Sequence, residues 1–291
     1  MNLNNSLNIF FKKKFVFINF LLLLSFFSYN FFLKANAQNI EVLIDEAIKG
    51  DHRSDKNKAR DKYRNPKETL LFFGLKPGMK VLELNPSRGW YTEIIAPVLK
   101  DNGLFVGANG NPKEDSPTWR KKVDEAYKKK LKKFPNVYGN ALVKNYDYES
   151  KKLEFTEPNT LDMVLTFRSI HNWAKAGTIE GMFDGFYISL KPGGILGVVQ
   201  HRAKPGTDFE KQINSGYITE DYVIEMAKKA GFKLQKKSEI NSNEFDTADH
   251  PGGVWNLPPR LRNLDDKDIP KYKSIGESDR MTLKFVKTVK Y

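Results

Sequence analysis

The sequence predicts an α/β protein in which a doubly wound, mostly parallel sheet of seven strands follows an N-terminal helical arm. The main observation is that short apolar runs alternate with amphipathic stretches between residues 79 and 199, a pattern typical of parallel sheets covered by helices. A chain of 291 residues that is 40% hydrophobic and 13% aromatic is long and apolar enough to bury one large core. This composition excludes an intrinsically disordered protein.

The first 37 residues have the three parts of a secretory signal peptide. Lysines 12–14 precede an apolar run over residues 15–33, and Ala35-Asn36-Ala37 provides a small-residue cleavage site. We therefore expect cleavage after Ala37 and a periplasmic or secreted protein, exported through a Sec-type signal peptide. The alternative is an uncleaved anchor, which would be the protein's only contact with the membrane, because the run is also long enough to span a bilayer. In both cases the domain lies outside the inner membrane, since the basic flank stays cytoplasmic.

Residues 38–64 are expected to form the helical arm and residues 65–291 the main domain. The apolar residues of the stretch 40–49 have the spacing of a short amphipathic helix, whereas the stretch 51–64 is almost wholly polar. Asn65, Pro66 and Glu68 match an N-cap, a proline at the first helical position and an acid in the first turn. We therefore expect a helix that starts here and ends at Gly74.

The remaining elements follow in order along the domain. We expect strands over residues 79–84, 104–108, 163–167, 195–199, 232–240 and 281–289, and a weaker strand near Val137. Helices are expected over residues 90–99, 117–133, 179–190 and 219–230. The first of these helices and its two flanking strands make a βαβ unit with a right-handed crossover. Residues 241–279 form a long polar excursion, which in a compact domain is either a lid or binding segment or a disordered loop.

Charge and composition narrow the classes of function. The formal net charge is +13 and cysteine is absent, which excludes disulfides, a thiolate nucleophile and cysteine-bound metal. Seven lysines between residues 121 and 133 lack the interleaved aromatic residues of a single-strand binder. A solvated helix face accounts for them better than a nucleic-acid or anionic-lipid patch. Apart from Asp246, Asp249 and His250, no close set of metal ligands occurs, and we expect neither a metal nor a nucleic-acid partner.

The turn after the first strand of the domain carries the most specific motif. The segment 81–92 reads VLELNPSRGWYT, with Glu83 in the strand and Asn85, Ser87 and Gly89 in the turn. Residues that are small or tolerate positive φ are needed where backbone approaches a ligand closely and the next helix presents its N-terminus. The segment resembles the first motif of class I S-adenosylmethionine-dependent methyltransferases, in which an acid ends strand one and three glycines form the turn. Of these glycines only Gly89 is present here.

Further motifs extend this resemblance over nearly the whole chain after the signal segment. Lys-Pro-Gly-Met at 76–79, Leu-Lys-Pro-Gly-Gly at 190–194 and Ala-Gly-Phe at 230–232 recur in the superfamily. The segments 64–70, 89–92, 167–173 and 200–202 are similar to those of a narrower group of predicted exported bacterial methyltransferases. The resemblance implies a Rossmann-like methyltransferase fold, S-adenosylmethionine as the cofactor and methyl transfer as the reaction.

The resemblance also implies which residues hold the cofactor. Asn109 takes the place of an acid at the end of strand two that accepts hydrogen bonds from the ribose hydroxyls, although an amide lacks the charge that strengthens such bonds. Asp147 and Asn140 are the candidates for the adenine contact. The predicted cofactor residues are Glu83, Asn85, Ser87, Gly89, Trp90, Tyr91, Asn109 and Asp147.

Candidate catalytic residues follow two further strands. Arg168 and His171 come directly after the strand 163–167, and His201 and Arg202 come after the strand 195–199. Because doubly wound sheets bind ligands at the carboxyl ends of their strands, these groups should meet in one crevice. The histidines are candidate general bases, and either arginine could hold an anionic part of the substrate. The candidates for a flat or apolar part of the substrate are Trp90 and Trp173.

Three functions are compatible with these residues. Methyl transfer to an unidentified small-molecule or cell-envelope substrate fits the motifs best. A non-catalytic ligand-binding or scaffold module of the cell envelope is the alternative, because two turn glycines are replaced and S-adenosylmethionine is made in the cytosol. A nicotinamide oxidoreductase fits less well, since the turn departs further from the dinucleotide fingerprint.

Overall fold

The computed structural model describes residues 40–112, 116–147, 150 and 153–288 of the chain. The predicted signal peptide, residues 1–37, and the expected first residue of the mature protein, Gln38, lie outside the described residues. The first described element is a helix over residues 40–49, and the compact unit that carries the sheet comprises Ile44–Tyr291. None of the helices in the described ranges is long and apolar enough to cross a membrane.

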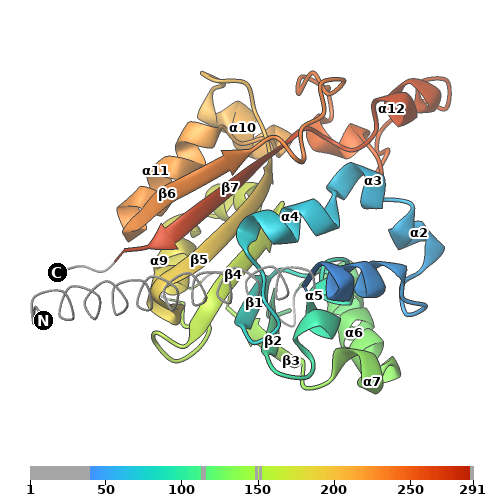
Figure 1. Cartoon of the computed structure of the whole chain (residues 1–291). Coiled ribbons are helices and arrows are strands. Elements are labelled where there is room, and N and C mark those ends of the chain that lie inside the picture. Colours follow the sequence, from blue (N-terminus) through green and yellow to red (C-terminus); the bar gives the residue numbers. More distant parts are fainter. Residues whose placement is uncertain (1–39, 113–115, 148–149, 151–152, 289–291) are drawn as a thin grey trace, which may run out of the picture. The chain divides into compact units, whose positions relative to one another are not determined.

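One sheet of seven strands forms the centre of this unit (Figure 1). The strands are β1 Lys80–Leu84, β2 Leu104–Gly110, β3 Leu142–Tyr146, β4 Leu161–Phe167, β5 Leu190–His201, β6 Phe232–Ser238 and β7 Arg280–Lys287. Their order is β3-β2-β1-β4-β5-β7-β6. The strands β1 to β5 pair in parallel, and β7 runs antiparallel to both β5 and β6. The predicted fold class is confirmed, and β1, β4 and β5 are adjacent at the centre of the sheet.

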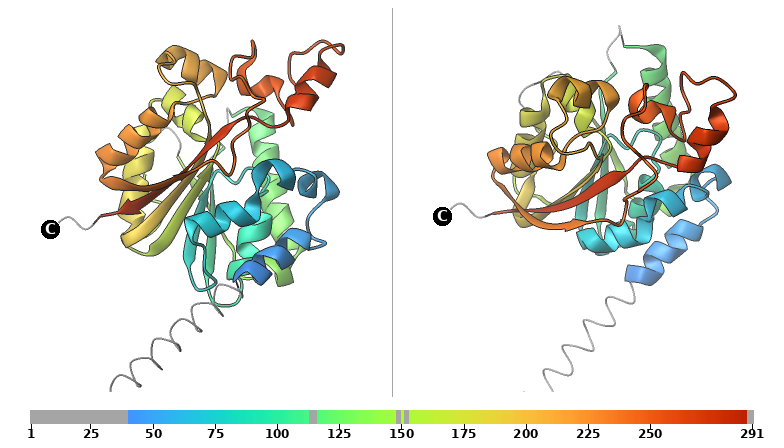
Figure 2. Two further views of the ribbon diagram at one scale, coloured as in Figure 1. Left: turned by 45° about the horizontal axis from the view of Figure 1, so that its top comes forward. Right: turned by 90° about the horizontal axis from the view of Figure 1, so that it is seen from above.

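Helices cover both faces of the sheet. After the helix 40–49, the helical elements are α2 Asp55–Lys58, α3 Asp61–Arg64, α4 Pro66–Phe73, α5 Thr92–Leu99, α6 Thr118–Lys133, α7 Pro135–Tyr138, α8 Ile170–Lys175, α9 Ile179–Ser189, α10 Phe209–Ser215, α11 Glu220–Ala230 and α12 Ile269–Ile275, with a 3-10 helix, η1, at Gly253–Asn256. The helices α4, α5 and α6 lie on one face, and α9 and α11 lie on the other (Figure 2). On the first face, Phe73 of α4 packs against Gly197 of β5, and Tyr127 of α6 packs against Gly107 of β2.

The central strands are apolar along their length because they are buried on both faces. In β4 every residue except Asp162 is buried. The core beneath α9 joins Leu82 and Val164 of the sheet to Phe183 and Phe186 of the helix. The apolar stripe predicted between residues 179 and 190 is therefore core.

The third strand of the sheet differs from the sequence prediction. Residues around Val137 form the helix α7 and not a strand, because Pro135 stands at the first helical position and Gly139 follows the last. The strand β3 lies further along the chain. It is an edge strand in which only Tyr146 is buried, so it lacks the apolar run by which a strand is recognised.

Smaller differences concern the ends of elements. Asn65 stands at the N-cap position of α4, but with φ of 39° its side chain does not cap the helix and instead donates to the carbonyl of Ile240 at 2.6 Å. The strand β5 begins at Leu190, earlier than expected, and so includes the Lys-Pro-Gly-Gly sequence. Val289, the expected end of the last strand, lies outside the described residues.

The long excursion over residues 241–279 is folded and contains η1 and α12. Asn243 Nδ2 donates to the carbonyls of Ile275 and Glu277 at 2.8 and 2.7 Å. The backbone N–H of Asp279 donates to Asp246 at 2.7 Å. These bonds show that the excursion is folded and not a disordered loop, and they position its last residues at the start of β7.

Candidate functional site

The turn between β1 and α5 has a left-handed backbone at three positions. The angle φ is 51° at Asn85, 56° at Ser87 and 75° at Gly89. These are the three positions at which the first methyltransferase motif has glycine, so the backbone keeps the conformation that glycine adopts most readily. Asparagine tolerates this region better than most residues, whereas for other residues it costs about 1–2 kcal/mol. The shape of the motif is therefore present although two of its glycines are not.

Neighbouring strands hold the turn in this shape. The backbone N–H of Asn85 donates to the carbonyl of Ala108 at 2.8 Å, and Asn85 Oδ1 accepts from the Tyr146 hydroxyl at 2.8 Å. The backbone N–H of Ser87 donates to Asn109 Oδ1 at 3.3 Å. Asn109 is 7% exposed, and its buried Nδ2 has no partner among the described residues. An unpartnered buried donor is costly, so this amide is suited to a ligand oxygen.

Glu83 lies beneath the turn, on the face covered by α5 and α6. It is 2% exposed, and its Oε2 accepts from the Thr92 hydroxyl at 2.6 Å. Burial raises the pKa of Glu83 to about 8, and the Thr92 bond opposes this only in part. The carboxyl group is therefore protonated at neutral pH and supports the start of α5. Asp147, by contrast, is exposed directly after β3.

Trp90 and Tyr91 form a buried wall that joins the turn to the N-terminal arm. Trp90 Nε1 donates to the carbonyl of Asn57 at 3.1 Å. The Tyr91 ring stacks on Phe167 with centroids 3.6 Å apart, and its hydroxyl donates to the carbonyl of Arg64 at 3.2 Å. Residues from the arm, β4 and the turn thus meet at one place.

His171 and His201 lie together at the carboxyl ends of β4 and β5, with ring centroids 5.8 Å apart. Nδ1 of His171 lies 3.3 Å from Nε2 of Gln200. Nδ1 of His201 makes a hydrogen bond with the Ser278 hydroxyl. The Trp255 ring from η1 stands edge-on to His171 at 5.9 Å. The adjacency of the two strands brings the candidate bases together, and the long excursion covers them.

Burial keeps both histidines neutral at pH 7. Desolvation lowers the pKa of His171 to about 4, and the charge of Arg168 adds to this while Gln200 opposes it. Desolvation also lowers the pKa of His201 well below its usual value, with further contributions from the charges of His171 and Arg168. Either ring can accept a proton, but burial, together with the positive charge around them, makes both weak bases.

Arg168 follows β4 in a left-handed conformation with φ of 60°. Its backbone N–H donates to the carbonyl of Val199 at 2.7 Å, and its side chain is partly exposed. Within the described part of the chain this side chain makes no hydrogen bond or ion pair. Desolvation and the charge of Arg64 lower its pKa well below the usual value. An unpaired guanidinium beside the histidines is suited to an anionic ligand.

Two side chains expected at the site serve the fold instead. Arg202 is held by Asp279, Glu220 and Glu239 at 2.8, 3.1 and 2.7 Å; it ties β5 to its neighbours and does not offer a free charge to a substrate. Trp173 is 3% exposed and packs on Phe186. It belongs to the core because α8 holds this side chain against α9.

No group of three metal-ligating side chains occurs in the described ranges. Asp246, Asp249 and His250 are the possible metal ligands in the sequence. Asp246 accepts from Tyr217 at 2.9 Å and lies 2.9 Å from His250 Nε2, whereas Asp249 is exposed and bonded to Thr247. These bonds hold the loop together.

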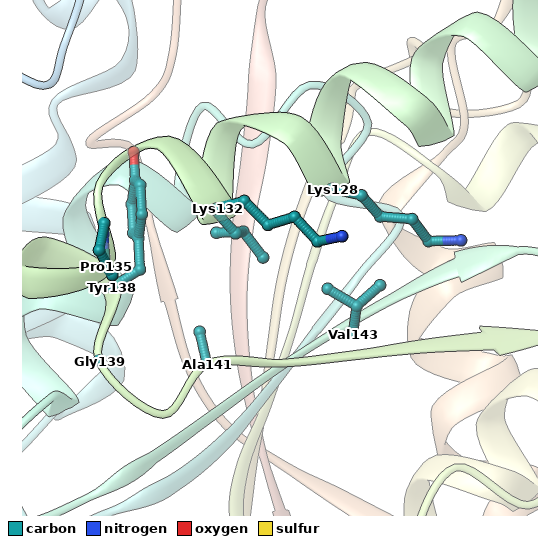
Figure 3. Close-up of a pocket in the computed structure, with 8 residues that line it drawn as sticks. Lys128, Lys132, Pro135, Tyr138, Gly139, Ala141 and Val143 are labelled. Carbon is teal, nitrogen blue, oxygen red and sulfur yellow. The ribbon is translucent and has the colours of Figure 1, made fainter.

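A cavity of about 330 Å³ lies between α6, α7 and β3, away from the candidate site (Figure 3). Ala141 and Val143 line it at the amino end of β3, whereas the turn and the histidines are at carboxyl ends of strands. The lysines of α6 that border it are Lys128 and Lys132. Lys128 also pairs with Asp124 of the same helix at 2.7 Å.

Several residues of the site carry no signal of their own in the sequence. Arg64 lies in the polar arm, Gln200 within a strand, and Trp255 and Ser278 in the excursion. Arg64 and Gln200 are part of segments that resemble the narrower methyltransferase group, which could have singled them out. Trp255 and Ser278 are recognised only when the fold brings them next to the histidines.

The sheet order and the turn define the fold of class I S-adenosylmethionine-dependent methyltransferases, and solved structures share it. A methyltransferase of this type from Aquifex aeolicus is similar with a TM-score of 0.52 and 15% identity, over 79% of this chain and 93% of that one. The 4+2 cyclase SpnF is similar with a TM-score of 0.52 and 16% identity, over 83% and 86%. Phospholethanolamine N-methyltransferase 2 from Haemonchus contortus, in complex with phosphomonomethylethanolamine and S-adenosylhomocysteine, has a TM-score of 0.50 and 16% identity, over 78% and 53%.

The likeness at these identities shows the fold alone, and one of the similar proteins is a cyclase. No family model matches the sequence. No curated protein matches it either.

Proposed function

We propose that the protein is an S-adenosylmethionine-dependent methyltransferase. The observation that carries the proposal is the turn from Asn85 to Gly89, in which three left-handed residues keep the shape of the glycine motif. Strained backbone persists where the surroundings enforce it, and it concentrates at ligand sites. The unpartnered Nδ2 of Asn109 beside this turn supports a ligand site over a plain loop.

The residues at the turn fit this cofactor. The backbone of Ser87 and Gly89 would contact its methionine and nucleoside portions, Asn109 Nδ2 would donate to a ribose hydroxyl, and Asp147 would contact the adenine. Glu83 would not contact the cofactor but would hold the start of α5 in place by accepting from Thr92. When bound, the cofactor supplies an electrophilic methyl group.

The acceptor would bind on the side of β4 and β5. His171 and His201 are neutral at pH 7, so either can take the proton that the acceptor loses on methylation. Arg168 lies close enough to both to affect the pKa of each, and it would hold an anionic part of the acceptor. Trp255 would exclude water from this side by covering His171.

We also propose that the protein is exported and acts on a small-molecule or cell-envelope acceptor, as in the group of methyltransferases with signal peptides that it resembles. Support comes from the basic, apolar and Ala-Asn-Ala parts of residues 12–37. Sequencing the N-terminus of protein from the envelope fraction tests this. Gln38 as first residue is the expected result, and an intact, membrane-embedded segment 1–33 would favour the anchored form.

Calorimetric titration of the full-length chain in mild detergent with S-adenosylmethionine and S-adenosylhomocysteine tests the cofactor. Both should bind, and Ser87→Val should weaken binding at least tenfold, because a β-branched residue is poorly tolerated at positive φ. Ser274→Val is the matched control, since Ser274 is exposed on α12. If neither compound binds, the non-catalytic module of the envelope replaces the enzyme as the best interpretation.

Turnover is tested with a labelled methyl donor and envelope extracts. His171→Ala and His201→Ala are compared with the wild type after cofactor binding of each variant has been verified. Loss of a general base should lower turnover by about 10²–10⁴-fold with cofactor affinity little changed. Full turnover in both variants would refute the assignment of either histidine as the base.

A further inference from the structure

Three arginine side chains gather around the carboxylate of Glu277 beside the histidine pair, and a fourth arginine follows β4 nearby. Glu277 accepts from Arg60 Nε at 2.6 Å and from Arg64 Nε at 3.0 Å. Nη1 of Arg280 lies 3.5 Å from the same carboxylate. Arg168 follows β4, beside the Tyr91 and Phe167 rings that adjoin Arg64, and burial, together with the charges of the other three arginines, lowers its pKa. We call Arg60, Arg64, Arg168 and Arg280 the arginine cluster.

The cluster carries positive charge that the described residues do not balance. Burial disfavours the charged form of Glu277, but the charges of Arg64 and Arg280 outweigh it and lower its pKa to about 2. Glu277 is therefore ionised and balances one of the four arginines. Asp279, which also acts on Arg280, is bound by Arg202 at 2.8 and 3.0 Å. A surplus of positive charge thus remains in this partly buried cluster, where it is unfavourable unless a counter-charge is supplied.

Several nitrogen atoms of the cluster lack partners. Nη1 and Nη2 of Arg64 and Nη2 of Arg60 are buried and make no hydrogen bond to the described residues. Arg64 as a whole is 1% exposed. The side chain of Arg168 is unpaired within the described ranges but partly exposed, so a ligand can reach it. Planar oxyanions satisfy guanidinium nitrogens in pairs, which makes arginine the preferred residue for carboxylate and phosphate.

The cluster adjoins both halves of the candidate site. On the cofactor side, Arg64 Cζ lies 4.5 Å from the centre of the Trp90 ring. On the acceptor side, the charges of Arg168, Arg280 and Arg64 all lower the pKa of His201. An anion held here would lie next to the histidines and close to the turn.

We infer that the arginine cluster binds an oxyanion group of the substrate, a carboxylate or a phosphate, with Arg64 and Arg168 as its main ligands. As a statement about the methyl acceptor, this inference rests on the proposed function. The bound anion balances the surplus charge and satisfies the free nitrogens, and it fixes the acceptor beside His171 and His201. It also makes both histidines stronger bases, because a nearby negative charge favours their protonated form.

Thermal unfolding of the full-length chain in mild detergent, followed by tryptophan fluorescence, tests the inference without cofactor. Samples contain potassium phosphate, acetate or chloride at equal ionic strength. Phosphate or acetate should raise Tm saturably relative to chloride, and the anion with the larger effect identifies the preferred group. Arg168→Met should bind that anion about 10- to 100-fold more weakly, the equivalent of one charge-assisted hydrogen bond.

Arg262→Met is the matched control, because it removes the same charge from an exposed arginine outside the cluster; it should respond to anions like the wild type. In chloride, Arg168→Met should melt above the wild type, since it relieves repulsion within the cluster. Equal anion responses of Arg168→Met and wild type, or no saturable response in the wild type, would overturn the inference. So would a lower Tm of Arg168→Met in chloride, because it would show this arginine to be paired without ligand. Titration with S-adenosylhomocysteine separates this inference from the proposed methyltransferase function. Cofactor binding without anion binding would contradict only the inference, and anion binding without cofactor binding would contradict only the proposed function.

Discussion

Gly89 is the one glycine of the turn from Asn85 to Gly89, and Gly89→Ala measures how closely other side chains pack against it. A Cβ atom here would lie 2.9 Å from Tyr127 Cε2 and 3.3 Å from Thr92 Cβ, and φ is +75°. Tyr127 cannot easily withdraw, because it is fully buried and also fills the space over Gly107, where a Cβ would lie 2.0 Å from its hydroxyl.

The expected loss of stability has two parts. The left-handed backbone costs a residue with a Cβ about 1–2 kcal/mol, and overpacking of a full core costs about 1–3 kcal/mol. Gly89→Ala should therefore lower the free energy of unfolding by about 2–5 kcal/mol. Gly206 separates the two parts, since it has φ of +75° but no atom within 4 Å of an added Cβ. Gly206→Ala should lose only the backbone part, about 1–2 kcal/mol.

Urea unfolding of both variants, followed by tryptophan fluorescence, measures the difference at unchanged m-value. In a Tyr127→Leu background the packing part of the Gly89→Ala cost should shrink, as a double-mutant cycle would show. A Gly89→Ala cost no larger than that of Gly206→Ala would refute the reasoning, because Tyr127 would then not be confined by the two glycines.

Two further predictions concern charge. The pKa of His171 is lowered from 6.5 to about 4; since the unfolded chain takes up this proton first as the pH falls, the free energy of unfolding should drop by about 3 kcal/mol between pH 7 and pH 4. Urea unfolding of His171→Gln should show a drop smaller by this amount, and an equal drop in both proteins would contradict the buried, neutral histidine. Asn109→Asp should bind S-adenosylhomocysteine about fivefold more tightly, because the carboxylate would accept from the ribose hydroxyl to which the amide donates, and this charge-assisted bond is about 1 kcal/mol stronger. Asn111→Asp, at an exposed position two residues on, should leave the affinity unchanged in the same calorimetric titration, and an equal gain in both variants would indicate long-range charge instead.

The strands and helices with strong periodicity are predictable from the sequence, and the exceptions have physical reasons. β3 was placed wrongly because a single edge strand with one buried residue has no apolar run. The folded state of residues 241–279 was not predictable, because its hydrogen bonds, such as those of Asn243, connect residues more than thirty positions apart. From its place at a strand end, the sequence predicts Arg202 to be a free charge. Its three carboxylate partners come from distant parts of the chain, so only the structure shows that it is paired.

The sequence by itself determined the α/β class, the turn from Asn85 to Gly89 and the polar groups after β4 and β5. These depend on local periodicity and on neighbouring residues, which a linear pattern records. Only the tertiary structure decided that Arg64 shares the carboxylate of Glu277, 213 positions away, next to Arg168. The charge states were decided in the same way: Glu83 is protonated and His171 neutral because burial removes the water that would stabilise their ions. Burial and long-range proximity are properties of the folded chain, and they turn a set of separate arginines and histidines into one site.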